Sequence, residues 1–330
     1  MEQTINIIKE LPSIFNQALA IINTLMEMIL SVLLAFGVIS GPATDDPITL
    51  KDAENVNLAV VAFADTHIRP TGISPYNLEC GLKDIDNSEI NFDALLIAGD
   101  ISELGDDISY ELMWDSLGEA EIENILLATG NHDVRVAYDL RTEQIIDKTG
   151  SFLGTEIDKP YYSYDINGYT FIVMGSDGRL FEKAFISDGQ LAFIDAELER
   201  ATKDGRPAFV VCHQPLENTH GLPEVWANGG IGEQSEQIRE ILVKYKNVFF
   251  LNGHLHDGVY ENSLEVLSEE NGVYSVNLPA YGKENDYGKF LQPGLGTYFE
   301  VYDDEVIFTA RDFREGKSLE GYTKAFTLIK

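Results

Sequence analysis

Short apolar runs alternate with amphipathic stretches along most of the chain, and polar residues follow each apolar run. In the first half, buried strands are predicted at residues 57–63, 92–98 and 123–129. In the second half, the predicted strands are residues 169–174, 209–212 and 248–251. Helices are predicted at residues 107–118, 187–202 and 234–245, the second with Ser187 as its N-cap. Strands that alternate with helices favour parallel or mixed sheets covered by helices.

The two ends of the chain differ from this pattern. Beyond Asn271, Tyr, Val, Phe and Thr are spaced by turn formers, which predicts antiparallel strands. Residues 41–47 have the Gly, Pro and Asp content of a linker. We therefore divide the chain into an N-terminal apolar segment (1–41), a linker and lead-in (42–56) and one domain (57–330).

The N-terminal segment is apolar enough to suggest a membrane role. Residues 18–40 are mostly apolar, and the most apolar part, residues 28–39, has the length of a signal-peptide core rather than of a full membrane span. Glu27 would cost roughly 2–3 kcal/mol near the centre of a bilayer. We predict a signal or membrane anchor, and hence an exported or membrane-tethered protein. The alternative is a packing helix, which leaves the protein cytoplasmic.

The positions of the histidines are the main chemical signal. Five of the six directly follow predicted strands: His67, His132, His213, His254 and His256. Asp65, Asp100 and Asn131 stand beside them. Because the carboxyl ends of strands in an α/β sheet converge on one crevice, these side chains are expected to lie together. Such a cluster is costly to bury unless cations neutralise it, which predicts a site for a pair of divalent cations.

The ligand types narrow the choice of metal. Imidazole and carboxylate without thiolate suit iron, manganese, zinc, nickel or cobalt rather than a structural zinc site. The two cysteines, Cys80 and Cys212, form no CxxC motif, and Cys212 lies in an apolar run that predicts a buried core position. Two metals roughly 3.5–4 Å apart lower the pKa of a bridging water and hold a phosphoryl group for in-line displacement.

The ordered motifs resemble those of one known family. They are Asp65-Thr-His67, Gly99-Asp100, Gly130-Asn-His-Asp133, His213 and Gly253-His-Leu-His256. Together they resemble the five signatures of the calcineurin-like metallophosphoesterases, over residues 57–256. The resemblance implies a four-layer α/β/β/α sandwich of two mixed sheets, and hydrolysis of phosphate esters with two transition-metal ions such as manganese, iron or zinc.

The resemblance also assigns roles position by position. The implied ligands of the first metal are Asp65, His67 and His256, with Asp100 bridging to the second. The implied ligands that complete the second metal are Asn131, His213 and His254. His132 would act on the substrate phosphate or the leaving oxygen, and Asp133 would orient His132 by accepting a hydrogen bond. The implied reaction is in-line attack on phosphorus by metal-bound hydroxide.

Two details compare the chain with branches of that family. Purple acid phosphatases have a metal-ligating Tyr three residues after the bridging Asp, where this chain has Glu103, so the purple type is disfavoured. The helix start at residues 187–193, Ser-Asp-Gly-Gln-Leu-Ala-Phe, is similar to the branch of cyclic-nucleotide and glycerophosphodiester phosphodiesterases.

Charge limits the substrates. The chain has 55 acidic and 23 basic side chains, for a formal net charge of −32, which repels nucleic acid backbones and anionic lipid. We therefore predict a small phosphate-ester substrate and no nucleic-acid partner. A nuclease and a non-catalytic interaction protein on the same fold are the alternatives. The pattern is compatible with phosphomonoesters and phosphodiesters, and with any oligomeric state.

Five further residues stand near the motifs: Arg135, Asp177, Arg179, His220 and Tyr281. Each could line a substrate pocket. For each we favour a role outside the chemistry, such as an exposed or ion-paired Arg135 and a surface His220.

Overall fold

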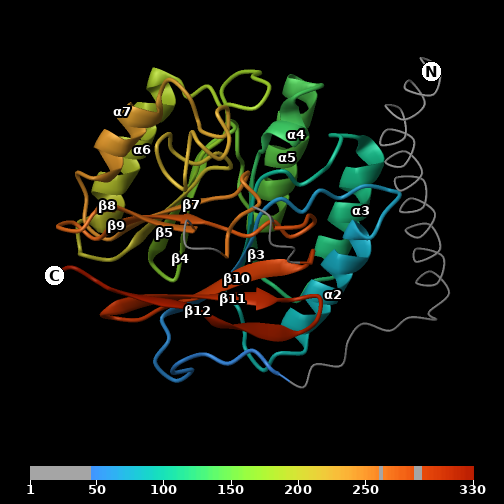
Figure 1. Cartoon of the computed structure of the whole chain (residues 1–330), viewed down its shortest axis with the longest axis horizontal. Helices are drawn as coiled ribbons and strands as arrows, with labels where there is room; N and C mark the ends of the chain where they lie inside the picture. Colours follow the sequence, from blue (N-terminus) through green and yellow to red (C-terminus); the bar gives the residue numbers. More distant parts are fainter. Residues whose placement is uncertain (1–45, 260–262, 286–291) are drawn as a thin grey trace, which may run out of the picture.

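The computed structural model describes residues 46–259, 263–285 and 292–330. Two six-stranded sheets lie face to face, with helices on both outer faces (Figure 1). The predicted four-layer α/β/β/α sandwich is confirmed. The N-terminal segment lies outside the described residues, so its role stays a prediction. Within the described ranges, no helix is both long and apolar enough to cross a bilayer.

The first sheet has the strand order β12-β11-β10-β1-β2-β3. Its strands are β1 (Leu58–Phe63), β2 (Ala94–Ala98), β3 (Asn124–Ala128), β10 (Leu295–Val301), β11 (Glu305–Asp312) and β12 (Lys317–Thr327). β1, β2 and β3 are parallel, whereas β10 is antiparallel to β1, and β11 and β12 continue the antiparallel half. The sheet is therefore mixed, with its parallel half supplied by the N-terminal part of the domain.

The second sheet has the order β4-β5-β6-β7-β9-β8. Its strands are β4 (Tyr162–Ile166), β5 (Tyr169–Val173), β6 (Ala208–Val211), β7 (Val248–Asn252), β8 (Leu264–Ser268) and β9 (Val273–Asn277). The prediction of only antiparallel strands beyond Asn271 is wrong for β9, which is parallel to β7. The hairpin of β8 and β9 reverses the chain at the outer edge, so β9 returns in the direction of β7.

The helices cover the outer faces. They are α2 (Ser74–Asp86), α3 (Asp107–Gly118), α4 (Asn131–Val134), α5 (Tyr138–Leu153), α6 (Asp188–Thr202) and α7 (Ser235–Leu242). Side chains of α2, α3 and α5 pack on the first sheet, and those of α6 and α7 pack on the second. Ser187 is the N-cap of α6, as predicted, since its hydroxyl accepts a hydrogen bond from the Gln190 amide at 3.2 Å.

The strand β1 shows why the apolar runs of the sequence are continuous. Val60 and Ala62 lie in the core between the two sheets, whereas Val61 and Phe63 face the helices outside. A strand buried on both faces needs apolar residues at every position rather than at alternate ones. Cys212 lies in the corresponding core between the second sheet and its helices and is buried, as predicted.

Candidate metal centre

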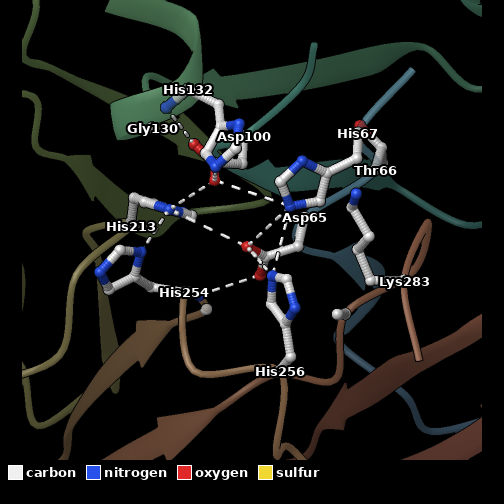
Figure 2. A network of polar contacts seen from close by, with 12 residues as sticks. Asp65, Thr66, His67, Asp100, Gly130, His132, His213, His254, His256 and Lys283 are labelled. Carbon is white, nitrogen blue, oxygen red and sulfur yellow. Dashed lines mark hydrogen bonds and ion pairs between the residues drawn. The ribbon is translucent and has the colours of Figure 1, made fainter. Parts of the chain in front are cut away.

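All the residues predicted for the metal site lie together where the central strands of the two sheets end. Asp65 and His67 follow β1, Asp100 follows β2, and residues 131–133 follow β3. From the second sheet, His213 lies just beyond β6, and residues 254 and 256 lie just beyond β7. Figure 2 shows seven of these side chains gathered around one space: Asp65, His67, Asp100, His132, His213, His254 and His256.

Asp65, His67 and His256 form a first group of donor atoms, all within 4.8 Å of one another. His256 Nε2 lies 3.2 Å from Asp65 Oδ1 and 3.2 Å from His67 Nε2. Three donors from two loops thus surround one point, which is the arrangement that a metal ion requires.

Asp100, His213 and His254 form a second group with the same spacing. His213 Nε2 lies 3.3 Å from Asp100 Oδ2 and 3.1 Å from His254 Nδ1. The amide oxygen of Asn131 is 3.1 Å from the same Nε2 atom. Asp100 Oδ2 also lies 3.7 Å from His67 Nε2, so this carboxylate stands between the two groups.

Backbone amides fix both aspartates. Asp65 Oδ2 accepts a hydrogen bond from the His254 amide at 2.9 Å, and Asp100 Oδ1 accepts one from the His132 amide at 2.8 Å. In each case the second oxygen faces the imidazoles. Because each carboxylate is anchored through one oxygen, the other oxygen is oriented toward the position where a cation would lie.

The contacts of the rings determine which nitrogens are free. His213 Nδ1 donates a hydrogen bond to the Ala98 carbonyl at 2.9 Å, and His67 Nδ1 lies 3.3 Å from Glu103 Oε2. The hydrogen bond of His213 places its ring proton on Nδ1, and the nearby Glu103 carboxylate favours the same tautomer of His67, so that Nε2 of each ring is a lone-pair donor toward the centre. Asp65 and Asp100 oxygens complete the donor set around these nitrogens.

The backbone of the site is strained. Five site residues that are not glycine have positive φ angles, from 43° to 70°: Asp65, His67, Asp100, His254 and His256. Such angles are costly for residues with a Cβ and cluster at functional sites. Gly99, with φ of 84°, also makes room for the metal site, because a Cβ there would lie 2.7 Å from that of His213.

The electrostatics of the cluster fit bound cations. Burial opposes ionisation of Asp65, yet His256 and His213 hold the pKa of its carboxyl well below its usual range. Burial likewise disfavours a charged His213, yet Asp100 and Asp65 raise its pKa to about 10. The carboxylates thus attract positive charge to the ring nitrogens, and cations bound by these donors would replace the protons.

His132 stands at the open edge of the centre, with 24% of its side chain exposed. Its Nδ1 donates a hydrogen bond to the Glu103 carbonyl at 2.7 Å, and its Nε2 lies 3.9 Å from Asp100 Oδ2. The prediction that Asp133 accepts this ring hydrogen bond is wrong.

The Asp133 carboxylate has other partners. It accepts hydrogen bonds from the backbone amides of Ile101, Ser102 and Gly130 and from the Tyr110 hydroxyl. These contacts tie the loop after β2 to the turn that carries His132. Burial and the nearby Asp100 raise the pKa of Asp133 to about 6. Asp133 therefore positions His132 through the backbone of these two segments and not through a hydrogen bond to the ring.

Three residues at the centre were not predicted as site residues. The Glu103 carboxylate lies between His67 and Lys283 and forms an ion pair with the ammonium group of Lys283. Figure 2 shows Lys283 beside His67 at the edge of the site. Glu182 Oε2 accepts a hydrogen bond of 2.8 Å from Asn131 Nδ2. These three residues are hard to recognise in the sequence, because they belong to none of the five motifs and their contacts join distant segments of the chain.

The weaker candidates mostly lie outside the centre. Asp177 accepts hydrogen bonds from the Ser187 amide and Gln190 Nε2, and so supports the start of α6, while Arg179 is exposed. Tyr281 is buried and stacks on Phe63 at 4.2 Å. These three side chains therefore do not reach the donor atoms.

Two predictions about the weaker candidates are wrong. His220 is not on the surface, since it is 2% exposed and its Nε2 lies 2.8 Å from Ser275 Oγ. Arg135 is half-buried and forms no ion pair within the described part of the chain. Its guanidinium lies 5.4 Å from the centre of the Phe181 ring instead.

The fold and the centre together define a metal-dependent phosphoester hydrolase. Residues 58–258 match the family model described as calcineurin-like phosphoesterase. The chain belongs to this family, and the resemblance found in the sequence is confirmed.

Two curated proteins illustrate the relationship. A 3',5'-cyclic-nucleotide phosphodiesterase of Nostoc sp. is 23% identical over 211 residues, which cover 62% of this chain and 73% of the relative. A protein of Vesicomyosocius okutanii, named "Probable cyclic nucleotide phosphodiesterase", is 25% identical over 254 residues, 76% of this chain and 96% of the relative.

Solved structures share the fold. A dimetal phosphatase from Danio rerio superposes with a TM-score of 0.62 at 12% identity, covering 83% of this chain and 100% of its own. A purple acid phosphatase from yellow lupin seeds superposes with a TM-score of 0.51 at 15% identity, covering 87% of this chain and 55% of its own. At these identities the likeness concerns the fold alone.

Proposed function

We propose that the protein hydrolyses small phosphomonoesters or phosphodiesters with two metal ions bound at this centre. The observation that carries the proposal is the position of Asp100, which faces His67 of the first donor group and His213 of the second. A carboxylate shared by two groups of donors is what a dinuclear site needs. Two transition-metal ions, such as manganese, iron or zinc, would lower the pKa of a water held between them and neutralise phosphate oxygens.

The other side chains of the centre would bind the metal ions or act on the substrate. Asp65, His67 and His256 hold the first position, and the second is completed by Asn131, His213 and His254, with Asp100 common to both. His132 keeps its Nδ1 proton on the Glu103 carbonyl and presents Nε2 to the open side. In the imidazolium form, which carries a second proton on Nε2, His132 would give that proton to the leaving oxygen. Lys283 adds a positive charge at the edge of the site.

The names of the relatives favour a phosphodiester as the substrate class. Both curated relatives are named as cyclic nucleotide phosphodiesterases. We therefore include 3',5'-cyclic nucleotides among the substrates to be tested. The net charge of −32 supports a small ester rather than a nucleic acid.

The test is a hydrolysis assay of the full chain after loading with manganese or iron. It compares bis-p-nitrophenyl phosphate, p-nitrophenyl phosphate and a 3',5'-cyclic nucleotide, for the wild type, His132→Ala and Asp100→Ala. We expect turnover of at least one ester and its loss by two orders of magnitude or more in both variants. His132→Ala removes one acid–base group, which is worth roughly 10²–10⁴-fold, and Asp100→Ala removes the carboxylate shared by the two donor groups. The preferred ester then separates a diesterase from a monoesterase.

Two results would change the proposal. Failure of every metal-loaded sample to hydrolyse any of the three esters would refute hydrolysis of small esters. Cleavage of single-stranded DNA or RNA faster than of bis-p-nitrophenyl phosphate would favour the nuclease alternative.

A further inference from the structure

Exposed apolar side chains concentrate in three stretches of the chain. Seven of the nine large apolar side chains that are exposed in the described part of the chain fall in residues 104–108, 136–140 and 180–185. We call these three stretches the apolar rim. Their most exposed members are Leu104, Val136 and Phe181, at 63%, 68% and 66%. Single exposed apolar residues are ordinary, but a contiguous set marks a binding surface.

Contacts of residues in or next to the three stretches hold these stretches near one another. Arg141, just after the second stretch, forms an ion pair with Asp107 of the first. The Tyr138 hydroxyl of the second stretch donates a hydrogen bond of 2.7 Å to the Ser176 carbonyl, in the loop that leads to the third. The Arg135 guanidinium lies 5.4 Å from the centre of the Phe181 ring.

The rim borders the metal centre on the side of His132. Leu104 follows Glu103, whose carbonyl holds the His132 ring. Phe181 precedes Glu182, whose carboxylate binds the Asn131 amide.

Val136, the third of these side chains, lies two residues beyond α4, the short helix that carries both Asn131 and His132. Each of the three most exposed apolar side chains is therefore close in the chain to a residue of the centre or to one that contacts it.

We propose that the apolar rim binds an alkyl or acyl chain of the substrate, so that the enzyme acts on amphiphilic phosphate esters. This inference rests on the proposed phosphoesterase function and names its substrate class. Most of the exposed rim side chains are aliphatic, and the Arg135 guanidinium lies over the Phe181 ring, so the rim suits a hydrocarbon chain better than a stacked base. The net charge of −32 opposes docking of the whole surface on anionic lipid.

The test uses a series of p-nitrophenyl alkyl phosphate diesters with methyl, butyl and octyl groups, below their micellar concentrations, and the manganese-loaded full chain. We expect kcat/KM of the wild type to rise at least tenfold from methyl to octyl, since each fully buried methylene contributes up to about fourfold. In the triple variant Leu104→Ser, Val136→Ser, Phe181→Ser, the ratio of octyl to methyl kcat/KM falls to within about threefold of one.

The matched control is Val266→Ser, which removes an exposed apolar side chain, 55% exposed, from β8 outside the rim. This variant keeps the full rise with chain length. Equal kcat/KM for all chain lengths in the wild type, or an unchanged rise in the triple variant, overturns the inference and leaves the proposed function intact. Absence of hydrolysis of all the diesters, bis-p-nitrophenyl phosphate included, overturns the inference. If p-nitrophenyl phosphate and a 3',5'-cyclic nucleotide are not hydrolysed either, the proposed function is refuted as well. If the triple variant only converts a dimer to a monomer in sedimentation, the rim joins two copies, and the inference is also overturned.

Discussion

Glu182 Oε2 accepts a hydrogen bond of 2.8 Å from Nδ2 of Asn131, across 51 positions of the chain. Because a carboxylate can only accept, this contact assigns the amide nitrogen to the side of Glu182 and turns the amide oxygen toward His213 Nε2, at 3.1 Å. An amide oxygen is the only Asn atom suited to bind a hard cation. Glu182 therefore positions a donor of the second metal group.

Replacement of Glu182 by Ala is expected to weaken binding at that second position. Loss of a residue that orients a ligand typically costs 10–100-fold in metal affinity. Glu182→Gln, which keeps a carbonyl acceptor, should retain most of the affinity. The measurement is manganese titration by calorimetry, with the number of ions per chain determined by elemental analysis. Equal affinities for the wild type and Glu182→Ala would show that Asn131 does not depend on this contact.

The variant His132→Ala distinguishes between two roles of His132, a catalytic group and a metal ligand. His132 Nε2 lies 3.9 Å from Asp100 Oδ2, near enough for a metal contact, but the structure ties the residue to Asp100 through its backbone amide, which Ala retains. We expect an unchanged number of ions per chain and a kcat lower by about 10²–10⁴-fold. A loss of one ion per chain in elemental analysis would identify His132 as a ligand instead.

Lys283 is expected to favour substrates of higher charge. Its ammonium group forms an ion pair with Glu103, and 32% of the side chain is exposed at the edge of the centre. Lys283→Met should raise KM for p-nitrophenyl phosphate, a dianion, by about tenfold, as loss of a hydrogen bond to a charged group predicts. The effect on the monoanion bis-p-nitrophenyl phosphate should be smaller.

The controls for Lys283 are a conservative and a remote substitution. Lys283→Arg keeps the charge and should keep most of the preference, and Lys324→Met removes an exposed lysine from β12 without effect on either KM. An equal rise in KM for both esters with Lys283→Met would mean that the lysine only supports Glu103.

The donor residues of the centre could be predicted from the sequence because parallel strands deliver their carboxyl ends to one place. Asp65, Asp100 and His213 each follow a continuous apolar run, and the sheets bring those run ends together. The same continuous runs predict strands that are buried on both faces, such as β1, and sheets covered by helices, whereas the four layers were implied by the resemblance to the family.

The contacts that orient these donors could not be predicted in this way. The ion pair of Glu103 with Lys283 depends on the turn after β9, which places residues 280–282 against the backbone after β1. The direction of β9 itself depends on its hairpin with β8, and the pattern of its side chains is the same in either direction. The positive φ angles of the site could not be predicted either, because most Asp and His residues have negative φ even though these types are enriched among the exceptions.

Metal binding is expected to stabilise the fold as well as to enable catalysis. At a free manganese concentration of 100 times Kd, binding to the folded state alone contributes about 2.7 kcal/mol. Chelation should therefore lower the melting temperature, and added manganese should restore it. A variant with Asp65→Asn and His256→Asn, which lacks two of the three donors of the first group, should respond less. An identical response of the two proteins in differential scanning calorimetry would place the stabilising ion elsewhere.

The buried ion pair between Arg311 and Asp84 gives a prediction about stability that is independent of the centre. Arg311 is fully buried on β11, and its Nε and Nη2 atoms donate hydrogen bonds of 2.7 and 2.9 Å to the Asp84 carboxylate on α2. Arg311→Met leaves that carboxylate buried without its partner, and should lower the free energy of unfolding by about 3–5 kcal/mol. The double variant Arg311→Met, Asp84→Leu should lose less, because no charge is left buried. Urea unfolding of the three proteins measures the difference, and a double variant less stable than Arg311→Met would show that the pair itself holds α2 on the sheet.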